Sequence, residues 1–380
     1  MTPITCIEDL RQLAERRVPR AFFQYVDSGS YAEETFRANR TDMERIKLRQ
    51  RVLVNVDKRD LSTTIVGQKV SLPIALAPVG LCGMQHGNGE ILAAQAANEA
   101  GVPFCLSTMS ICSMEQVAEA TKKPFWFQVY VIRDRGFIAD LIRRAKAVNC
   151  SALVLTVDLQ VLGQRHRDIK NGMTVPPQIK LANLIDMATK PRWAWSVLNA
   201  KSKTFGNLAG HVKGMEGVNS LAQWTNNQFD PTLNWKDVEW IRSLWPGKLI
   251  IKGILDAEDA KLATKSGADA IVVSNHGGRQ LDGAAAPLRV LPRIAEVAQG
   301  MAVLFDSGIR RGTDVIKALA LGADFVFVGR PFLYAAAIGQ EAGVRRGVDL
   351  LRSEIHRNLA FLGARDLSEL DGRVKPIERC

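Results

Sequence analysis

The sequence predicts an α/β fold, a (β/α)8 TIM barrel with an N-terminal helical cap and a long insertion after strand 4. Eight short apolar runs alternate with segments of helical periodicity, the pattern of parallel strands joined by crossover helices. Nearly every run ends in residues that carry chemistry. Because the C-terminal ends of barrel strands converge on one mouth, a closed barrel explains this distribution. A doubly wound sheet is the alternative, but no GxGxxG follows the first run.

The spacing of apolar residues gives the elements in order. The expected strands are Pro73–Pro78, Phe104–Thr108, Phe125–Tyr130, Ala152–Asp158, Leu249–Gly253, Ala270–Asn275, Ala302–Ser307 and Phe325–Arg330. Helical periodicity between them covers Gly87–Ala100, Asp134–Val148, Ala257–Ser266 and Gly312–Leu321. The chain is therefore expected to form a single domain over residues 1–380, with a C-terminal helix and tail over 340–380.

Two segments lie outside this alternation. Residues 1–70 read as a cap on the barrel and begin with an amphipathic helix, Ile7–Arg16. Residues 171–235 form an insertion that holds Pro176-Pro177, an apolar stretch and the cluster Pro191–Trp195. Interleaved Trp, Leu and Lys suit a membrane interface, so residues 176–215 are expected to contact an anionic membrane surface. The alternative is a soluble lid that packs its tryptophans on the barrel.

Composition narrows the class of protein. The net charge of +11 favours anionic partners, but no zinc-finger spacing and no RNP-like motif is present, so we expect no nucleic-acid partner. The six cysteines form no CxxC pair, which indicates reduced thiols in a cytoplasmic protein. Five histidines without an HxH or HxxxH pair give no support to a metal site.

The segment Ser274–Asp282, SNHGGRQLD, is the most informative motif of the chain. His276 exchanges protons near neutral pH, and Arg279 offers a planar fork that fits a carboxylate. A strand end that carries both is typical of a catalytic βα-loop. A helix cap with a solvated arginine is the plainer alternative.

Other strand ends add to this chemistry. Asp158 would orient a catalytic histidine and stabilise its protonated form. Arg165 and Arg279 together would make a carboxylate clamp, although a surface role for Arg165 is equally compatible with the pattern. Lys252 ends the fifth strand, where it could be a charge partner for an anion, a Schiff-base former or part of a structural ion pair.

Two late segments predict a phosphate site. Phe305–Gly312 and Phe327–Pro331 each run from a strand through a glycine turn and a basic residue to a helix start. Loops after strands seven and eight of barrels frequently bind phosphate through backbone N–H groups and a helix N-terminus. A phosphorylated ligand, either cofactor or substrate, is expected there.

Together these residues resemble the FMN-dependent α-hydroxy-acid dehydrogenase/oxidase family over essentially the whole chain. The motifs that carry the resemblance are SNHGGRQLD, TVD-x4-G-x-R, DSGIRRGTD and VGRP. Ala77–Met84, Trp193–Trp195, Asn227–Pro231 and Ile251–Asp256 are similar to the bacterial membrane-associated L-lactate dehydrogenases within that family.

The resemblance implies FMN at the barrel mouth and a homotetramer. His276 would be the base, Asp158 would support its imidazolium form, and Tyr130 would contact a substrate oxygen. Arg165, Arg279 and Tyr25 would hold the substrate carboxylate. The implied FMN ligands are Pro78, Val79, Gly80, Ser107, Gln128, Thr156, Lys252, Ser274, Asp306, Gly308, Arg310, Gly329 and Arg330.

The implied activity is oxidation of a small L-2-hydroxy acid, L-lactate to pyruvate above all, with electrons passing to a quinone or a cytochrome-type acceptor. The implied location is the cytoplasmic face of the inner membrane, as a peripheral protein. Alternatives are a soluble oxidase that makes hydrogen peroxide, a dehydrogenase for L-mandelate or a longer acid, and a non-redox phosphate-binding barrel. Gln160-Val161 departs from the family's Pro-containing pair, and Gly80 stands where many oxidases carry Ala. Met109 and Val161 are expected to line the substrate pocket.

Overall fold

Eight parallel strands form a closed barrel in the computed structural model, which describes residues 3–173, 178, 180–210, 224, 227–298 and 300–376. The strands are β4 (Ile74–Leu76), β5 (Cys105–Ser107), β6 (Trp126–Tyr130), β7 (Ala152–Thr156), β8 (Lys248–Ile254), β9 (Ala270–Val273), β10 (Ala302–Phe305) and β11 (Phe325–Val328). Their order in the sheet is β4-β11-β10-β9-β8-β7-β6-β5, and a parallel bridge between Leu76 and Phe104 joins the two ends. The predicted TIM barrel is confirmed.

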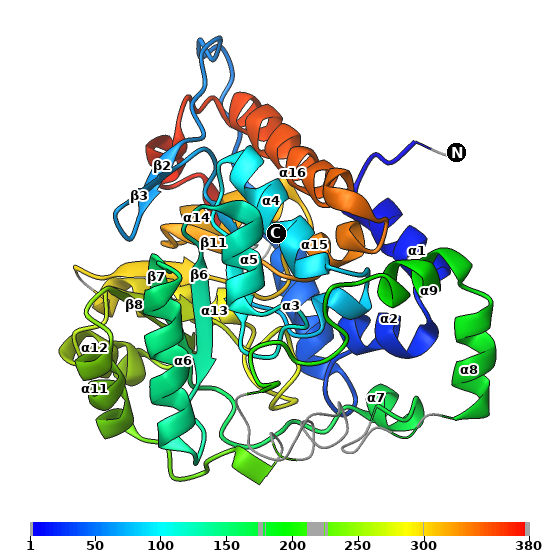
Figure 1. Cartoon of the computed structure of the whole chain (residues 1–380). Helices are drawn as coiled ribbons and strands as arrows, with labels where there is room; N and C mark the ends of the chain where they lie inside the picture. Colours follow the sequence, from blue (N-terminus) through cyan, green and yellow to red (C-terminus); the bar gives the residue numbers. More distant parts are fainter. Residues whose placement is uncertain are drawn as a thin grey trace.

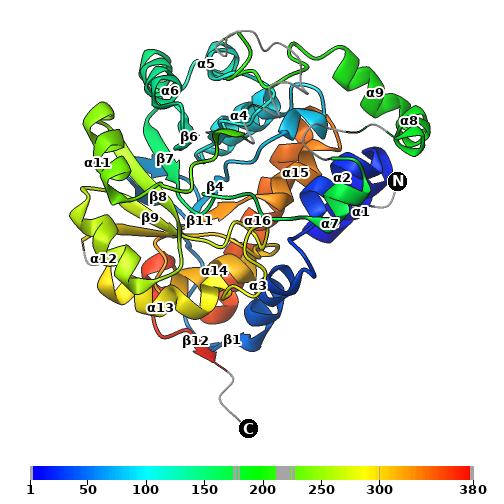
Figure 2. The same ribbon diagram turned by 90° about the horizontal axis from the view of Figure 1, so that it is seen from below.

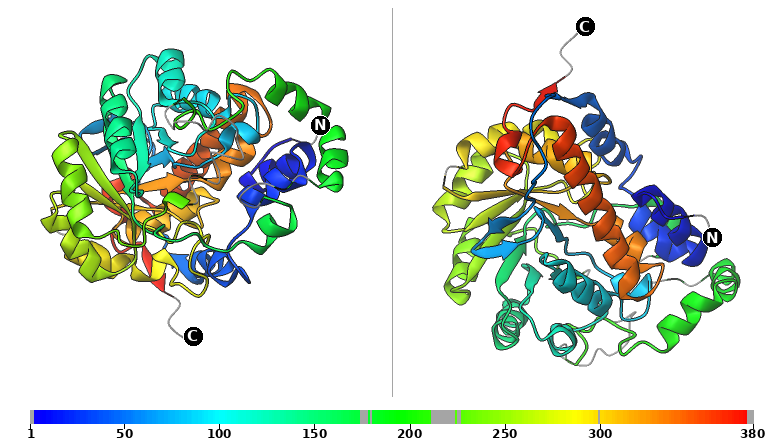
Figure 3. Two further views of the ribbon diagram at one scale, coloured as in Figure 1. Left: turned by 60° about the horizontal axis from the view of Figure 1, so that its bottom comes forward. Right: turned by 90° about the horizontal axis from the view of Figure 1, so that it is seen from above.

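Helices surround the barrel, and a helix follows each strand (Figure 1). They are α4 (Gly89–Ala100), α5 (Met114–Thr121), α6 (Arg135–Ala147), α11 (Trp235–Leu244), α12 (Ala257–Lys265), α13 (Pro287–Val297), α14 (Gly312–Ala320) and α15 (Arg330–Ala336). The long α16 (Gln340–Leu362) runs outside this ring and packs on α4, α14 and α15 (Figure 3).

Alternation of side chains along each strand builds two apolar layers. Phe325 and Phe327 point into the barrel with Trp126 and Leu304, whereas Val326 faces the surrounding helices. A hairpin of β2 (Thr63–Ile65) and β3 (Gln68–Val70) packs against the inner layer through Ile65 and Val70. The interior of the barrel is therefore a packed core of side chains.

The N-terminal cap contains α1 (Ile7–Arg17), α2 (Arg20–Asp27) and α3 (Glu34–Arg45), followed by β1 (Ile46–Leu48). Strand β1 pairs with β12 (Val374–Pro376), so the expected C-terminal tail returns to the cap as an antiparallel strand. Asn39 of α3 and Asn275, in the loop after β9, exchange two amide hydrogen bonds of 3.0 and 2.7 Å. This pair ties the cap to the loop that carries the predicted catalytic histidine.

Helix α7 (His166–Lys170) precedes the insertion, which contributes α8 (Leu181–Ala188) and α9 (Pro191–Leu198). Figure 2 shows α8 and α9 at the periphery of the molecule, next to the N-terminal helices. Asp186 of α8 accepts from the backbone N–H of Arg20, and the Lys190 ammonium donates to the Arg16 carbonyl. Other parts of this segment, Pro176-Pro177 among them, lie outside the described residues.

One tryptophan of the insertion packs on the protein, as expected of a lid, and another is exposed, as expected of a membrane-contact segment. Trp193 stacks on Phe22 with ring centroids 5.4 Å apart and donates to the Met84 carbonyl, as a packed lid would. Trp195 is 71% exposed. None of the helices in the described part of the chain combines the length and apolar character needed to cross a bilayer.

Candidate active site

One cavity of about 510 Å³ lies at the C-terminal ends of the strands. It is lined by most of the residues predicted from the strand ends. These are Tyr25, Pro78, Val79, Gly80, Tyr130, Arg165, Lys252, His276, Arg279, Asp306, Gly308, Arg310, Gly329 and Arg330. Ser107, Gln128, Thr156, Asp158 and Ser274 do not line the cavity but belong to the strand ends that surround it.

His276 is held by a carboxylate. Its Nδ1 lies 2.9 Å from Oδ1 of Asp158, and its backbone N–H donates to the Ser274 hydroxyl. The backbone φ of His276 is 56°, in the left-handed region that histidine adopts more readily than most residues. With Nδ1–H donated to Asp158, Nε2 is the nitrogen left to accept a proton from a ligand.

A glycine on the neighbouring strand leaves the room that the Asp158 side chain occupies. Gly253 has a φ of 113°, and a Cβ on it would come within 2.7 Å of the Asp158 side chain. Burial acts to raise the pKa of Asp158, but the His276 imidazole and the Lys252 ammonium outweigh that effect and lower the pKa. The carboxylate is therefore ionised at neutral pH and stabilises a protonated His276.

Lys252 carries a charge in the barrel mouth. Its ammonium donates to the Ser274 hydroxyl at 2.9 Å and lies 3.1 Å from Oδ2 of Asp306. Burial acts to lower the pKa of Lys252, yet Asp306 and Asp158 together raise it. A charged, ion-paired ammonium is a poor Schiff-base nucleophile, so this environment favours an electrostatic role for Lys252.

Two arginines flank Tyr25. The guanidinium carbons of Arg165 and Arg279 lie 5.7 and 4.7 Å from the Tyr25 ring centroid. Arg279 also donates to the backbone carbonyls of Tyr25 and Ser28. Burial and the neighbouring Arg165 lower the pKa of Arg279, as expected of two cations that share one enclosed space. The pair therefore favours an anion, and a carboxylate fits the guanidinium fork.

Asp168 is a residue that the sequence reasoning missed. Its Oδ2 accepts from Nε of Arg165 at 2.5 Å, and the side chain is buried on the short helix α7. Contact at Nε leaves the two terminal nitrogens of Arg165 available to a ligand. The three-residue Arg–Asp spacing was the available signal, because residues three apart on a helix are neighbours.

Tyr130 ends β6 in the cavity wall. Burial and the neighbouring Asp158 carboxylate raise the pKa of its phenol. The hydroxyl therefore keeps its proton at neutral pH and can donate a hydrogen bond to a ligand oxygen.

Two buried polar atoms fit the flavin ring that the resemblance implies. Ser107 donates to Oε1 of Gln128 at 3.1 Å. Nε2 of Gln128 and Oγ1 of Thr156 are buried without a hydrogen-bond partner in the described protein. Buried polar groups of this kind normally have partners, and the carbonyl and imide edge of an isoalloxazine offers them.

Two further arginines fit the phosphate of FMN. Within the described chain neither Arg310 nor Arg330 forms an ion pair; Arg330 instead donates to the carbonyls of Val26 and Ser28. Burial, followed by the proximity of Arg310, lowers the pKa of Arg330 to about 9. An anion would relieve this repulsion. Because Arg330 begins α15, the helix N-terminus adds N–H groups of the kind that bind phosphate.

Of the two residues expected to line the substrate pocket, one lines the cavity and the other does not. Met109 lines the cavity, as predicted. Val161 does not, and its side chain is 68% exposed. The loop after β7 turns outward at that point, so the expectation for Val161 was wrong. The unusual Gln160 beside it donates to the Leu233 carbonyl and thereby fixes this loop to the far end of the insertion.

Comparison with known proteins agrees with this geometry. The family model for FMN-dependent dehydrogenases matches residues 14–375. A structure of (S)-mandelate dehydrogenase, described as a monotopic membrane protein, superposes with a TM-score of 0.93 at 35% identity, covering 99% of this chain and 100% of that one.

Two further solved structures show the same likeness. Mandelate oxidase with (S)-4-hydroxymandelic acid gives a TM-score of 0.84 at 36% identity, with 98% of both chains covered. A soluble mutant of the membrane-associated (S)-mandelate dehydrogenase from Pseudomonas putida gives 0.84 at 35% identity, covering 98% of this chain and 100% of that one.

Replacing Asp168 by Asn tests its role in positioning Arg165. The substitution removes the charge that anchors Nε, so we expect the Kd of a small monocarboxylate to rise by roughly tenfold, or about 1.4 kcal/mol. Titration calorimetry of the FMN-loaded protein with pyruvate measures this. Glu258→Gln, which removes an exposed ion pair with Lys261 on α12, is the control. An unchanged Kd in Asp168→Asn would show that Arg165 needs no anchor.

The lowered pKa of Asp158 predicts a pH dependence of stability. A carboxyl group whose pKa is depressed by folding stabilises the protein above its unfolded pKa of about 4. That contribution is lost as the pH falls through the folded pKa. In Asp158→Asn, the free energy of unfolding should therefore fall less steeply below about pH 4. Urea titrations between pH 7 and pH 3 measure the slope, and identical acid limbs would contradict the assignment.

Proposed function

This chain belongs to the FMN-dependent dehydrogenase family, and from that premise we propose that it oxidises a short L-2-hydroxy acid, L-lactate above all, to the 2-oxo acid. Oxidation of 2-hydroxy acids with FMN is the chemistry of the family, which rules out a non-redox barrel. The substrate, the electron acceptor and the roles of single residues are the proposed part. One observation carries it: His276, held by Asp158, lines the same cavity as Arg165 and Arg279.

The arrangement gives each end of a hydroxy acid a partner. Arg165 and Arg279 bind the carboxylate, which orients the α-carbon toward His276. Nε2 of His276 takes a proton from the substrate at the hydroxyl or the α-carbon, and Asp158 stabilises the imidazolium that results. The neutral phenol of Tyr130 donates to the oxygen that becomes the carbonyl. Tyr25 packs between the arginines and limits their movement.

FMN supplies a two-electron acceptor when it is bound at the mouth. Lys252 places a positive charge there, which favours extra negative charge on a group beside it. Gln128, Thr156, Ser107 and Ser274 offer polar partners at the strand ends. Asp306, Gly308, Gly329, Arg310 and Arg330 surround the region where a ribityl chain and a phosphate fit, while Pro78, Val79 and Gly80 form the apolar wall at the end of β4.

Membrane contact is the second part of the proposal. The outer face of α8 exposes Leu181, Leu184 and Ile185 at 73, 51 and 60%, and α9 exposes Trp195 and Leu198 at 71 and 65%. Contiguous exposed apolar side chains on adjacent helices are unusual in a soluble monomer. The nearby basic residues Lys180 and Arg192 suit an anionic headgroup layer. The similar mandelate dehydrogenase is itself described as a monotopic membrane protein.

A membrane quinone is the acceptor that this surface favours. The cavity that holds His276 is also lined by Phe22, Met84, Asn183 and Met187. Asn183 and Met187 belong to α8, whose outer face is the exposed apolar one. An apolar quinone that leaves the bilayer at α8 would therefore have a short route to the cavity. A cytochrome-type acceptor remains an alternative, and so does a soluble oxidase that reduces oxygen.

L-Mandelate is the alternative substrate, because the similar solved structures carry that name. Support for L-lactate comes from the resemblance to L-lactate dehydrogenases, which is carried by Ala77–Met84, Trp193–Trp195, Asn227–Pro231 and Ile251–Asp256. Homotetramer formation also stays a prediction.

Replacing His276 by Ala tests the assigned base. The variant should keep its yellow FMN, because the residues proposed to hold the phosphate, Arg310 and Arg330, are unchanged. We expect the rate of flavin reduction by L-lactate to fall about 10²–10⁴-fold. Stopped-flow absorbance under anaerobic conditions measures the rate, and the visible spectrum of the resting protein is the control. Retained turnover would remove His276 from the mechanism.

The double substitution Leu184→Asp/Ile185→Asp tests membrane contact. Two charges on the outer face of α8 should abolish co-sedimentation with phosphatidylglycerol vesicles, because burying them in an apolar layer is unfavourable. The rate of flavin reduction by L-lactate should stay unchanged, while reduction of vesicle-embedded quinone should fall. Leu262→Asp/Phe361→Asp, at exposed apolar positions on α12 and α16, is the matched control. Equal sedimentation of both variants would contradict the membrane surface, and a high yield of peroxide per turnover would favour the oxidase.

A further inference from the structure

Phe229 stands in the cavity wall beside the predicted catalytic residues. It lines the same cavity as His276, and its ring meets the Tyr130 ring edge to face, with centroids 6.3 Å apart at 77°. Phe229 belongs to the return segment Asn227–Asp237, which comprises the end of the insertion and the first residues of α11. A part of the chain remote from the barrel strands therefore supplies an aromatic wall to the site.

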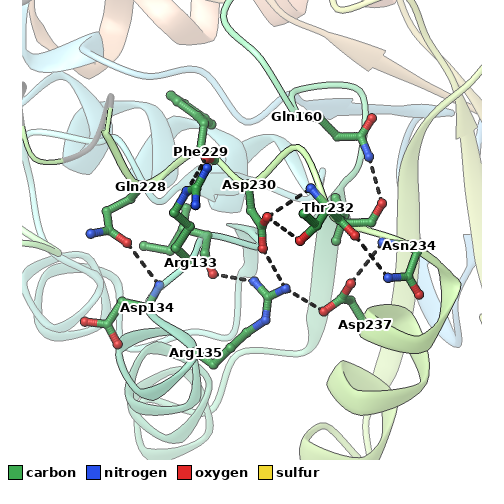
Figure 4. Close-up of polar contacts among 12 residues, drawn as sticks. Arg133, Asp134, Arg135, Gln160, Gln228, Phe229, Asp230, Thr232, Asn234 and Asp237 are labelled. Carbon is green, nitrogen blue, oxygen red and sulfur yellow. Dashed lines mark hydrogen bonds and ion pairs between the residues drawn. The ribbon is translucent and has the colours of Figure 1, made fainter.

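The backbone of Phe229 is fixed to the loop after β6. Phe229 forms an antiparallel bridge with Ile132, and its carbonyl accepts from Nε of Arg133 at 3.2 Å. The carbonyl of Gln228 accepts from the backbone N–H of Arg133 at 2.9 Å, and the Gln228 side chain accepts from the backbone N–H of Asp134 at 3.0 Å. Figure 4 shows the contacts of Arg133 with Phe229 and of Gln228 with Asp134. The loop that starts from Tyr130 thus also sets the position of Phe229.

Charges behind the wall reinforce this placement. The Arg135 guanidinium lies 2.9 Å from Oδ2 of Asp230 and 2.6 Å from Oδ1 of Asp237 (Figure 4). The other oxygen of Asp230, which is buried, accepts from the backbone N–H and the hydroxyl of Thr232. Hydrogen bonds from Thr232, together with the charge of Arg135, lower the pKa of Asp230. One arginine therefore binds Asp230, next to Phe229, and Asp237 at the end of the return segment, so the backbone beside the Phe229 ring is held at two points.

The geometry of a 2-hydroxy acid determines which of its groups faces Phe229. A 2-hydroxy acid has three groups on its α-carbon besides hydrogen. The carboxylate goes to Arg165 and Arg279, and the hydroxyl goes to His276 and Tyr130. The remaining side chain meets the apolar lining of the cavity, to which Phe229, beside Tyr130, and Met109 belong. A rigid ring at that place excludes large side chains, because a packed wall yields little to extra volume.

We propose that Phe229 sets the upper size of the substrate side chain and that Arg135 is the positioning residue that keeps it in place. This inference rests on the proposed function and deepens it. It assigns short aliphatic 2-hydroxy acids as the substrate class and excludes aryl acids. The wild-type enzyme should therefore show a higher kcat/KM for L-lactate than for L-mandelate.

Phe229→Ala and Phe229→Leu test the wall directly. Removing the ring opens space next to Tyr130, so the ratio of kcat/KM for L-mandelate to that for L-lactate should rise at least tenfold in Phe229→Ala, since even one methylene in a hydrophobic pocket changes discrimination by about 10–200-fold. Phe229→Leu should give a smaller rise. The visible flavin spectrum of each variant reports whether the barrel has folded around FMN.

Arg135→Gln tests the positioning role. The ratio should move in the same direction as in Phe229→Ala but less, with the change appearing mainly in KM for L-mandelate. Arg143→Gln is the matched control: it removes an exposed ion pair with Asp140 on the same helix and should leave the ratio unchanged. A merely structural role for Arg135 would lower both activities together without moving the ratio.

The outcomes separate the inference from the function on which it rests. If neither acid reduces the flavin of the wild-type enzyme, the proposed function fails and the inference fails with it. If the wild-type enzyme prefers L-mandelate, or if the ratio stays constant in Phe229→Ala, the function stands and the size limit is overturned. A raised ratio in Phe229→Ala and Arg135→Gln, with Arg143→Gln unchanged, supports both.

Discussion

The ion-paired Asp158 carboxylate is the constraint on which the rest of the site depends. A charge placed at the end of β7 without a partner would be strongly unfavourable. His276 and Lys252 provide the partners from two neighbouring strand ends, and Gly253 provides the space. The same pairing fixes the imidazole ring and leaves its second nitrogen toward the cavity. Stability and the proposed proton transfer thus require the same arrangement of three neighbouring parallel strand ends.

Positive charge dominates the remaining lining of the cavity. Arg165 and Arg279 stand at one side, and Arg310 and Arg330 stand in the loops after β10 and β11. Asp168 is the acidic group in contact with the first pair. The described protein therefore leaves two places where an anion is favoured: one suits a substrate carboxylate and the other the phosphate of FMN. The two arginine pairs thus offer separate binding sites for the two anionic groups, the substrate carboxylate and the FMN phosphate.

The strands and most of the site could be predicted because each follows from a local pattern. Buried parallel strands read as continuous apolar runs, so β7 begins at Ala152 as expected and ends two residues before Asp158. Chemistry at strand ends then placed His276, Lys252 and Arg330. Contacts between distant polar residues carry no such pattern. The pairing of β1 with β12, the Asn39–Asn275 pair and the hold of Arg135 on Asp230 and Asp237 are set by tertiary packing alone. The outward turn of the loop at Val161 is likewise set by tertiary packing and has no local sequence pattern.

FMN bound at the barrel mouth should be reduced by a short L-2-hydroxy acid. An anaerobic visible spectrum of the purified protein, taken before and after addition of L-lactate, measures this reduction. We expect a flavin band that L-lactate bleaches, with fast recovery on adding a quinone analogue and slow recovery in air. A flavin band that no 2-hydroxy acid bleaches, or a colourless protein that takes up no FMN, would contradict it.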